Sequence, residues 1–417
     1  MKKIALLLVS LCICLIAFAN VYPYTFQDDS GNTITVREPF KRILSLYGAH
    51  TENFYYMGAQ DLLIGISDNE AFPPSFRNKP SFSYKDDPEK FIQADPDLVI
   101  LRPMIVQRYP KLIEKLQKYG ITVVSLQPEN YSDIFNYWEV LGVLCGKIQE
   151  SKDMKDSFLN QLNMFKELDK SAYTTVFFES VHKNFKTTTN GSIADFVLKR
   201  SGLDNIAQSA QQVREGSTIA EFSKEQLIDN GDKIEFYIAQ VGVMNKITVQ
   251  AIKKEPGIAA VKAVREDNII LVDEKIISRP TPRIIYAIMD FYKIMHNDLF
   301  MSEYELYNDA PLTNLSFSRI IIDCLKIPFT TPEYFTEEKE KNGHLFGQFK
   351  DIDYVSTAHI YAETAFYNDI VNTSADRFEP DKKISSQSIA DTLKKLTGKT
   401  LEKTLSTNRE LIDYLRK

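Results

Sequence analysis

The sequence predicts an α/β protein: two three-layer α/β lobes joined by one long rigid helix and followed by a mainly helical C-terminal domain. Short apolar runs typical of buried strands alternate with amphipathic helical segments, and this order occurs twice. An uninterrupted helical pattern separates the two sets. The predicted parts are a signal peptide (1–19), an N-terminal lobe (20–146), a connecting helix (147–170), a C-terminal lobe (171–299) and a helical extension (300–417).

The overall composition is that of an ordinary globular protein. The chain has 417 residues, of which 44% are hydrophobic and 25% charged, and its formal net charge is −6. This length suffices for two or three domains. The mild acidity and the lack of a basic stripe argue against binding to nucleic acid.

The N-terminus has the pattern of a signal peptide. Lys2 and Lys3 precede an apolar run, Ile4 to Phe18, that is too short for a comfortable membrane span. Ala17-Phe18-Ala19 fits a cleavage site with small residues. We therefore expect a location outside the cytoplasm, in the periplasm or at the cell surface.

The four cysteines give no sign of a disulfide framework. Cys12 and Cys14 lie in the N-terminal apolar run, and because neither follows a small residue, a lipid anchor has only weak support. Cys145 and Cys324 each lie in an apolar helical pattern, so we expect two separately buried thiols.

The first lobe opens with a predicted β-hairpin, Tyr24 to Val36, centred on the turn residues Asp28 to Asn32. Strands and helices then alternate, which indicates parallel pairing through crossover helices. One helix is expected from Thr51 to Met57, with Thr51 as its N-cap. The expected strands are 42–46, 62–66, 98–101 and 121–126, and the other expected helices are 87–92, 110–119 and 132–144.

The connecting helix is predicted over residues 147–170, which contain no glycine or proline. Met154, Phe158, Leu162 and Phe165 recur every three or four residues and so share one helix face. About two dozen residues in a helix span ~35 Å, enough to cross a whole domain.

The second lobe repeats the alternation of strands and helices predicted for the first. A strand over 174–179 precedes a helix over 192–199, and a closing helix is expected from Arg283 onward. The remaining expected strands are 234–239 and 268–273, and the remaining expected helices are 222–227, 248–253 and 256–263.

Several motifs, taken in order, resemble the substrate-binding proteins of iron-siderophore and cobalamin ABC importers. The motifs are Pro39-Phe-Lys-Arg-Ile-Leu-Ser-Leu, Thr51-Glu52, Met57-Gly58-Ala59, Asp95-Pro-Asp-Leu-Val-Ile, Gly120-Ile-Thr-Val-Val, Asn190-Gly-Ser, Ser201-Gly-Leu-Asp-Asn-Ile-Ala207 and Ser278-Arg-Pro-Thr-Pro-Arg283. Together they cover roughly residues 35 to 297. The resemblance implies two lobes bridged by a rigid helix, and delivery of a small-molecule ligand to a membrane permease, without a cofactor.

In that family, an acidic surface residue on each lobe docks to the permease. Glu225 fits this role for the second lobe. In the first lobe, the helix taken as its match starts at Gln107 to Lys111 with no acidic residue, so the role moves to Glu114.

The candidate ligand-binding residues follow predicted strands, because ligands of such sheets bind beyond the carboxyl ends of the strands. Their cationic and aromatic side chains suit an anionic, partly aromatic chelate. The set consists of Tyr47, His50, Arg102, His182, Lys183, Arg214, Gln240 and Arg279.

We therefore expect a binding protein that captures a ferric chelate, of the siderophore or ferric citrate type, in the cleft between the lobes. Cobalamin, haem or a free metal ion are the alternative ligands. A metal site is not expected, because the five histidines never pair at i, i+2 or i+4. No hydrolase or nucleotide-binding motif is present in the sequence, so we expect no enzymatic activity.

The extension after residue 300 resembles surface-layer homology repeats, in Phe349-Lys-Asp-Ile, a helix over 358–367, and Phe378 to Gly398. In that family a Thr-Arg-Ala-Glu stretch contacts an anionic cell-envelope polymer. The matching Thr313 to Ser316 and Ser385 to Ser388 lack both the Arg and the Glu. We expect a helical packing or partner-binding module. The alternative is a surface-anchored structural or adhesive protein that works through this extension.

Overall fold

The structure is a computed structural model that describes residues 21–68, 79–163, 165, 173–295, 306–327, 329, 349, 351–352, 357–374 and 377–416. The predicted signal peptide, with Cys12 and Cys14, lies outside these ranges. No helix within them combines the length and the apolarity that a bilayer span requires. Two compact units are present: Met1–Phe72, Phe76–Pro128 and Asp133–Lys155 form the first, and Pro73–Ser75, Glu129–Ser132 and Asp156–Lys417 form the second.

The first unit contains a β-hairpin and a five-stranded parallel sheet with the strand order β5-β4-β3-β6-β7. The hairpin strands β1 (Tyr24–Gln27) and β2 (Thr33–Val36) pair antiparallel, as predicted. The sheet strands are β3 (Ile43–Ser45), β4 (Leu63–Ser67), β5 (Ser81–Phe82), β6 (Leu98–Leu101) and β7 (Thr122–Ser125).

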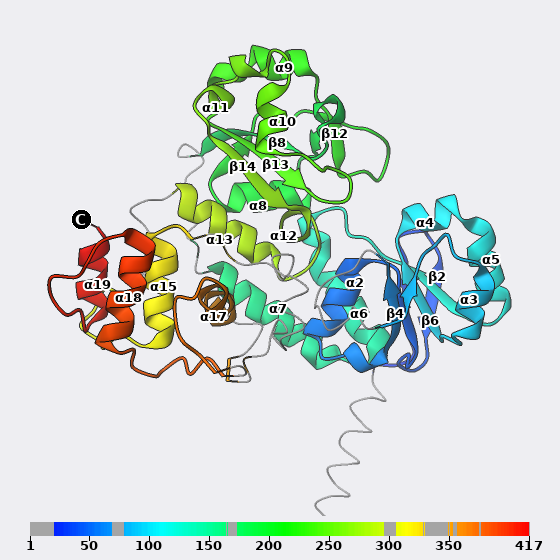
Figure 1. The fold of residues 1–417 in the computed structure, drawn as a ribbon. Coiled ribbons are helices and arrows are strands. Elements are labelled where there is room, and N and C mark those ends of the chain that lie inside the picture. Colours follow the sequence, from blue (N-terminus) through cyan, green and yellow to red (C-terminus); the bar gives the residue numbers. More distant parts are fainter. Residues whose placement is uncertain are drawn as a thin grey trace, which may run out of the picture. The chain divides into compact units, whose positions relative to one another are not determined.

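Helices cover both faces of this sheet, which gives the three predicted layers. Helices α2 and α6 lie on one side and α3, α4 and α5 on the other (Figure 1). All four residues of Leu98–Leu101 are buried, because a strand covered on both faces needs an unbroken apolar run. The helices are α2 (Gly48–Tyr56), α3 (Pro88–Gln93), α4 (Pro103–Arg108), α5 (Pro110–Lys118) and α6 (Ile134–Cys145).

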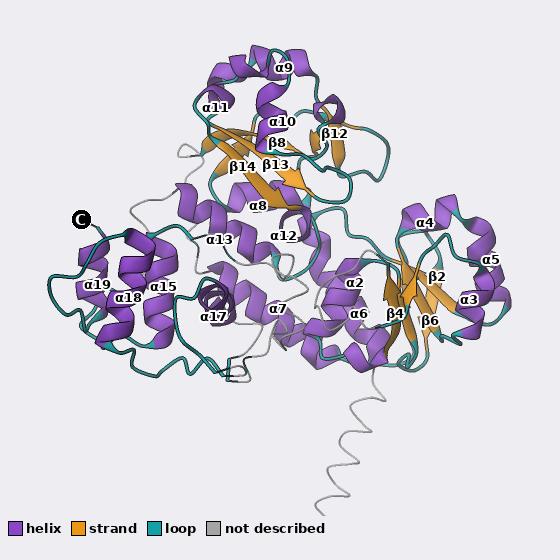
Figure 2. Cartoon of the chain, in the orientation of Figure 1, coloured by secondary structure: helices purple, strands orange, loops and turns teal. Residues whose placement is uncertain are grey.

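The second lobe is built around a four-stranded parallel sheet with the order β10-β8-β13-β14. A small antiparallel sheet with the order β11-β12-β9 is formed by strands that fall between β8 and β13 in the sequence. The strands are β8 (Thr174–Glu179), β9 (Thr187–Thr188), β10 (Leu203–Asn205), β11 (Gln211–Gln212), β12 (Ile219–Glu221), β13 (Phe236–Val241) and β14 (Ile269–Asp273), drawn as orange arrows in Figure 2.

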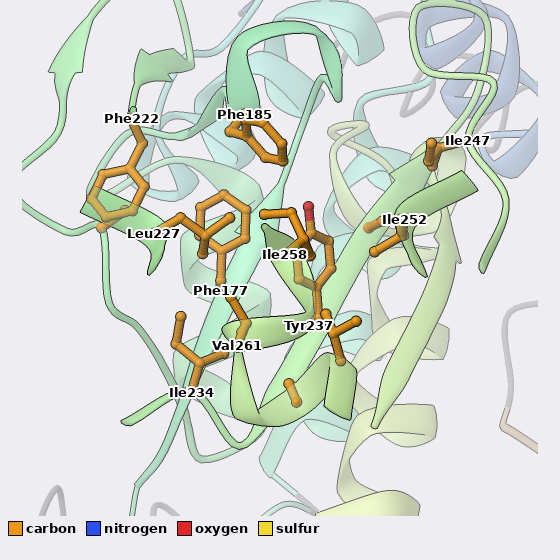
Figure 3. Close-up of a cluster of buried hydrophobic side chains, with 14 residues drawn as sticks. Phe177, Phe185, Phe222, Leu227, Ile234, Tyr237, Ile247, Ile252, Ile258 and Val261 are labelled. Carbon is orange, nitrogen blue, oxygen red and sulfur yellow. The ribbon is translucent and has the colours of Figure 1, made fainter. Parts of the chain in front are cut away.

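The main core of this lobe lies between its sheet and one helical layer. Phe177 of β8 and Tyr237 of β13 pack against Leu227 of α9 in a cluster of buried side chains (Figure 3). The helices of this layer are α9 (Lys224–Asp229), α10 (Val249–Lys254) and α11 (Lys262–Arg265), and the helices of the other layer are α8 (Ile193–Arg200), α12 (Glu274–Ile277) and α13 (Ile284–Met295).

The two parallel sheets share one topology, which confirms the repeated rhythm read from the sequence. In each sheet the first of the four equivalent strands (β3 or β8) is central, the second (β4 or β10) lies on one side, and the third and fourth lie on the other. The helix before the third strand is α3 in the first lobe and α9 in the second. These two helices are therefore topological counterparts.

Helix α7 (Ile148–Asn163) is the observed form of the predicted connecting helix, and the boundary between the two units falls inside it. Residues 164 and 166–170 of the predicted span lie outside the described ranges. The predicted apolar face is buried: Met154, Phe158, Leu162 and Phe165 are 1–6% exposed. Arg200 of α8 donates to the carbonyl oxygens of Leu162 and Phe165 at 3.0 Å each.

The start of α7 packs closely against the end of α6. Gly146 ends α6 in the left-handed conformation with φ 71°, and the Lys147 N–H donates back to the Gly142 carbonyl at 2.7 Å. A Cβ atom at Gly142 would lie 2.5 Å from Ser151 Oγ and 2.9 Å from Lys147 O. Only glycine therefore fits where the two helices meet.

The described part of the extension is helical, with α15 (Asn314–Cys324), α17 (Thr357–Tyr367), α18 (Ser386–Thr397) and α19 (Asn408–Leu415). Thr313, Ser385 and Thr407 cap the starts of α15, α18 and α19. Backbone hydrogen bonds connect the segments that precede α15, α18 and α19. The Leu312 N–H donates to Ser406 O, and the Ile384 N–H donates to Leu312 O, both at 3.1 Å. The pattern of Lys399 to Lys417 predicts one amphipathic helix, and the structure forms its second part, Asn408–Leu415.

Both described cysteines are free thiols, so no disulfide joins them. Cys145 is buried, as expected. Cys324 is exposed, so the expectation of a second buried thiol was wrong.

Gly142→Ala is expected to destabilise the first lobe by about 1–3 kcal/mol, because the added methyl group overpacks the contact between α6 and α7. Urea unfolding followed by far-UV circular dichroism measures the loss. Asn136→Ala, at an exposed position of the same helix, is the matched control and should change the midpoint little. Equal midpoints for the Gly142 variant and the wild type would contradict this close packing.

Candidate functional site

The carboxyl edge of the first sheet carries a stacked pair, Tyr47 and Arg102. Tyr47 follows β3 and is the N-cap of α2, and Arg102 follows the neighbouring β6 and is the N-cap of α4. The Arg102 guanidinium carbon lies 4.5 Å from the centroid of the Tyr47 ring. No described side chain or carbonyl accepts a hydrogen bond from this guanidinium or forms an ion pair with it. Its Nε is buried without a partner, so the terminal N–H groups are the donors left for an anion.

His50 lies inside the first lobe and does not line its surface. Helix α2 begins at Gly48, before the predicted N-cap Thr51, so His50 is a helix residue and has no exposed surface. Its Nε2 lies 3.3 Å from the Leu101 carbonyl, which can only accept, so Nε2 carries the proton and Nδ1 accepts from the Tyr137 hydroxyl at 2.7 Å. Burial lowers the pKa of His50 to about 3, and the ring stays neutral.

The position of His50 gives it a supporting role instead of the predicted ligand contact. Its ring meets the Tyr47 ring edge-on, with centroids 5.1 Å apart and planes at 88°. Its bond to the Leu101 carbonyl holds the backbone directly before Arg102. His50 thus contacts the Tyr47 ring directly and fixes the backbone that precedes Arg102.

In the second lobe, the last residue of β8, Glu179, organises the carboxyl edge. Its side chain has no exposed surface, yet it accepts three hydrogen bonds. The Tyr237 hydroxyl donates to one carboxylate oxygen, Asn245 Nδ2 donates to the other at 3.2 Å, and His182 Nδ1 lies at 2.8 Å. Burial and the adjacent Glu179 raise the pKa of Tyr237 well above its usual value, so its hydroxyl stays a donor.

His182 connects this buried carboxylate to helix α9. The hydrogen bond to Glu179 raises the pKa of His182 above its usual value. Its other nitrogen, Nε2, lies 3.9 Å from Glu255, which also pairs with Lys224 at 2.6 Å. The His182 ring is therefore placed between two carboxylates, with Lys224 at the start of α9 close by.

A cavity of about 440 Å³ opens beside this network. It is lined by two predicted ligand-binding residues, His182 and Lys183, and by the predicted docking residue Glu225. The full lining is His182, Lys183, Asn184, Phe185, Ser223, Lys224, Glu225 and Glu255.

Gln240 and Arg279 are largely engaged within the second lobe. The Gln240 side-chain oxygen accepts a hydrogen bond from the Ser278 hydroxyl. Arg279 is only 8% exposed and lies 3.8 Å from the Glu274 carboxylate. Each leaves a small surface at the carboxyl edge, so direct ligand contact through either side chain stays a prediction.

Arg214 lies apart from the His182 cavity. It lines a separate, open groove of about 540 Å³ near β11, whose lining shares no residue with that cavity. The groove is formed by Thr189, Asn190, Gln208, Ser209, Ala210, Gln211, Gln212, Arg214 and Glu215. The predicted ligand-binding residues of the second lobe thus do not line one common pocket: His182 and Lys183 line the cavity, and Arg214 lines the groove.

The shared topology bears on the candidate docking residue of the first lobe. Glu225 is exposed at the second position of α9, after the N-cap Ser223. The counterpart of α9 is α3, whose second residue is the exposed Glu89 after the N-cap Asp87. Glu114 lies on α5 before β7, which is a different place in the topology. The shared topology therefore adds Glu89 as a candidate docking residue beside the predicted Glu114, and neither is tested by the fold.

A sequence signal for Glu89 does exist. In both helices the acidic residue follows a capping residue by two positions and precedes a buried hydrophobic residue by two, Phe91 in α3 and Leu227 in α9. In neither lobe, nor elsewhere in the described ranges, do three or more His, Cys, Asp or Glu side chains gather where they could hold a metal ion.

Comparison with known proteins identifies the family. Residues 43–276, more than half of the chain, match the family of periplasmic binding proteins. The uncharacterized ABC transporter substrate-binding lipoprotein YvrC of Bacillus subtilis (strain 168) is 24% identical over 289 residues, which are 67% of this chain and 88% of that protein. A vitamin B12-binding protein of Vibrio parahaemolyticus is 23% identical over 256 residues, 61% of this chain and 88% of the relative.

Among solved structures, a possible iron-binding, periplasmic solute-binding protein of Staphylococcus epidermidis ATCC 12228 has a similar fold. The TM-score is 0.52 at 22% identity, and the match covers 61% of this chain and 98% of that one. The family match ends at residue 276, so the resemblance of residues 300–417 to surface-layer homology repeats stays a prediction. The chain belongs to the periplasmic binding protein family, as a substrate-binding protein of the ABC transporter type and not an enzyme.

Proposed function

We propose that the chain captures a ferric chelate outside the cytoplasm and delivers it to an ABC permease. The observation that carries the proposal is the Tyr47–Arg102 pair at the carboxyl edge of the first sheet, with its uncommitted guanidinium. A guanidinium forks onto two oxygens of a carboxylate, catecholate or hydroxamate, and the ring beneath it adds an aromatic contact. Siderophores and ferric citrate present such oxygens.

The second lobe offers one further cation for such a ligand. Lys183 lines a cavity near the carboxyl edge and forms no ion pair within the described residues, whereas His182 and Lys224 lie against Glu179 and Glu255. The similarity to the possible iron-binding protein of Staphylococcus epidermidis favours iron, and the similarity to the vitamin B12-binding protein of Vibrio parahaemolyticus makes cobalamin the second candidate. A free metal ion has no cluster of ligands among the described residues.

A ligand panel tests the proposal. The purified chain is titrated with ferric citrate, a ferric hydroxamate, haem and cobalamin, and both its tyrosine and tryptophan emission and its melting temperature are followed. A ligand that binds the folded chain raises apparent stability by mass action, by about 2.7 kcal/mol at a hundredfold excess over Kd. Saturable binding of an iron chelate is expected. An unchanged melting temperature and emission with all four ligands would overturn the proposal.

Arg102→Met is expected to weaken binding of the ferric chelate at least tenfold, because it removes a charge-assisted, bidentate contact worth about 1.5–3 kcal/mol. Arg108→Met is the matched control. Arg108 is the last residue of the same helix α4, at the end away from β6, and its guanidinium carbon lies 5.9 Å from the centroid of the Tyr109 ring. Fluorescence titration gives both affinities. Equal losses in the two variants would contradict a specific role for Arg102.

The contribution of His182 to binding should depend on pH. Its pKa is raised, so the ring stays charged above its ordinary range and loses this charge as the pH rises through the raised value. The affinity ratio of wild type to His182→Gln for the anionic chelate should therefore fall toward one as the pH rises through and above the ordinary range of histidine. The ratio cancels the titration of the chelate itself. A ratio that stays constant, or rises, would contradict the assignment.

Glu89→Lys should leave ligand affinity unchanged and lower chelate uptake at least tenfold in cells that carry the matching permease, because it reverses the charge of a docking side chain. The lost surface pair with Lys115, 2.7 Å in length, is worth only about 0–1 kcal/mol. Glu114→Lys, a reversal on the neighbouring helix α5, is the matched control and should transport normally. The opposite pattern would return the docking role to Glu114.

A further inference from the structure

A cation–aromatic patch lies on the first lobe, where the chain leaves β5 and where α4 meets α5. The Tyr84 and Tyr109 rings contact each other, with centroids 5.0 Å apart. Lys85 Nζ lies 5.9 Å from the centroid of the Tyr84 ring, and the Arg108 guanidinium carbon lies 5.9 Å from that of the Tyr109 ring. Both rings are half-buried and both cations are exposed. The patch thus presents two positive charges held over one pair of rings.

The acidic side chains that follow the patch in the sequence neutralise little of this charge. Asp86 pairs with Lys90 at 2.6 Å, and Glu89 pairs with Lys115 at 2.7 Å. Asp87 accepts a hydrogen bond from the Glu89 N–H as the N-cap of α3. Each of these carboxylates is therefore already committed to another group of the same helical layer.

The start of α5 adds to the positive charge of the patch. Lys111 is the second residue of this helix and is exposed. Within the described residues, neither Lys111 nor the two cations of the patch form an ion pair. Glu114, one turn further along α5, is the exposed acid that opposes them. The balance leaves a local positive surplus on a chain whose formal net charge is −6.

The patch belongs to the helical layer that carries both candidate docking residues of the first lobe. Glu89 lies in the first turn of α3 and Glu114 lies on α5, and α3, α4 and α5 cover the same side of the sheet (Figure 1). A residue that docks to the permease turns its surroundings toward the bilayer in which the permease is embedded. Whichever of the two glutamates docks, this layer is therefore the part of the first lobe that meets lipid.

We propose that Lys85, Arg108 and Lys111 bind the anionic headgroups of the membrane surface and hold the first lobe beside the permease. This inference rests on the proposed function and adds a second partner to it, the lipid bilayer. Each Lys or Arg near an anionic lipid surface strengthens binding about fivefold. Tyrosine is enriched at the headgroup level of membranes, so the two rings that carry the cations suit this boundary.

The charge of the rest of the chain makes the contact specific to one face. Because the net charge is −6, the molecule as a whole is repelled by an anionic bilayer, whereas the patch is attracted to it. Both forces act over the Debye length, about 10 Å at 0.1 M salt. The chain is therefore expected to bind weakly, in one orientation, and only at low to moderate ionic strength.

Sedimentation with lipid vesicles tests the inference. The purified chain is mixed with phosphatidylglycerol–phosphatidylcholine vesicles or with phosphatidylcholine vesicles, and the bound fraction is measured in low salt and in about 0.5 M salt. Binding is expected to the anionic vesicles only, and it should disappear in high salt. Lys85→Ser/Arg108→Ser should lower the affinity at least tenfold. Lys85→Arg/Arg108→Lys, which keeps both charges, should retain it.

The matched control is Lys394→Ser/Lys399→Ser, which removes the same charge from two exposed lysines of the extension and should bind like the wild type. Melting temperatures confirm that these exposed substitutions leave the fold intact. A wild type that does not bind anionic vesicles, or equal losses in the two serine pairs, overturns the inference. Displacement by free glycerol phosphate at constant ionic strength assigns the cations to a soluble anion, which also overturns it.

The ligand panel separates this inference from the proposed function. Both serine pairs should bind the ferric chelate as tightly as the wild type, because neither pair includes a candidate ligand-binding residue. A chain that binds the chelate and no vesicle loses the inference and keeps the proposed function. A chain that binds none of the four ligands loses the proposed function, whether or not it binds vesicles.

Discussion

The second lobe depends on one buried carboxylate. Glu179 has no exposed surface, and an ionisable group in that position is tolerated only when its oxygens are hydrogen-bonded. Donors from three separate segments meet this need: Tyr237 within β13, His182 after β8, and Asn245 in the loop after β13. Because leaving a buried charge without its partners is far more costly than any surface contact, these segments have one satisfactory arrangement. The edge of the sheet is fixed as a consequence.

The same parallel topology supports different chemistry in the two lobes. Both sheets place the ends of their strands at one edge, so side chains distant in the sequence come together there. In the first lobe that edge carries a cation stacked on a ring, held from below by the neutral His50. In the second it carries a buried acid with three hydrogen-bond partners, one of which is His182, whose pKa the bond to Glu179 raises. A repeated fold thus carries side chains of unlike character at the carboxyl edge of each lobe.

The periodicity of the sequence predicted the elements well and the roles of single residues less well. Strands such as Leu98–Leu101 and helix α7 were predictable because burial on two faces, or on one helix stripe, leaves a regular apolar pattern. The start of α2 was not, because its N-cap Tyr47 makes no capping bond through its side chain and Thr51 resembles a better cap. That shift of a few residues moved His50 from a loop into the core. Glu114 was chosen by similarity of sequence, whereas the order of helices and strands adds Glu89 as a candidate, so the docking residue of the first lobe stays a prediction.

The extension closes on itself through bonds between residues far apart in the chain. Leu312 pairs with Ser406 and Ile384, and Asn408 donates to the carbonyl of Ala310. Contacts of such long sequence separation form late, since the intervening chain must first be ordered. During synthesis, helix α15 therefore meets α17 first, the segment at its start then bonds to residues 380–384, and Ser406 joins last, about ninety residues after Leu312. Proteolysis of the nascent module should therefore stop in stages, and the Leu312–Ser406 bond closes the last of them.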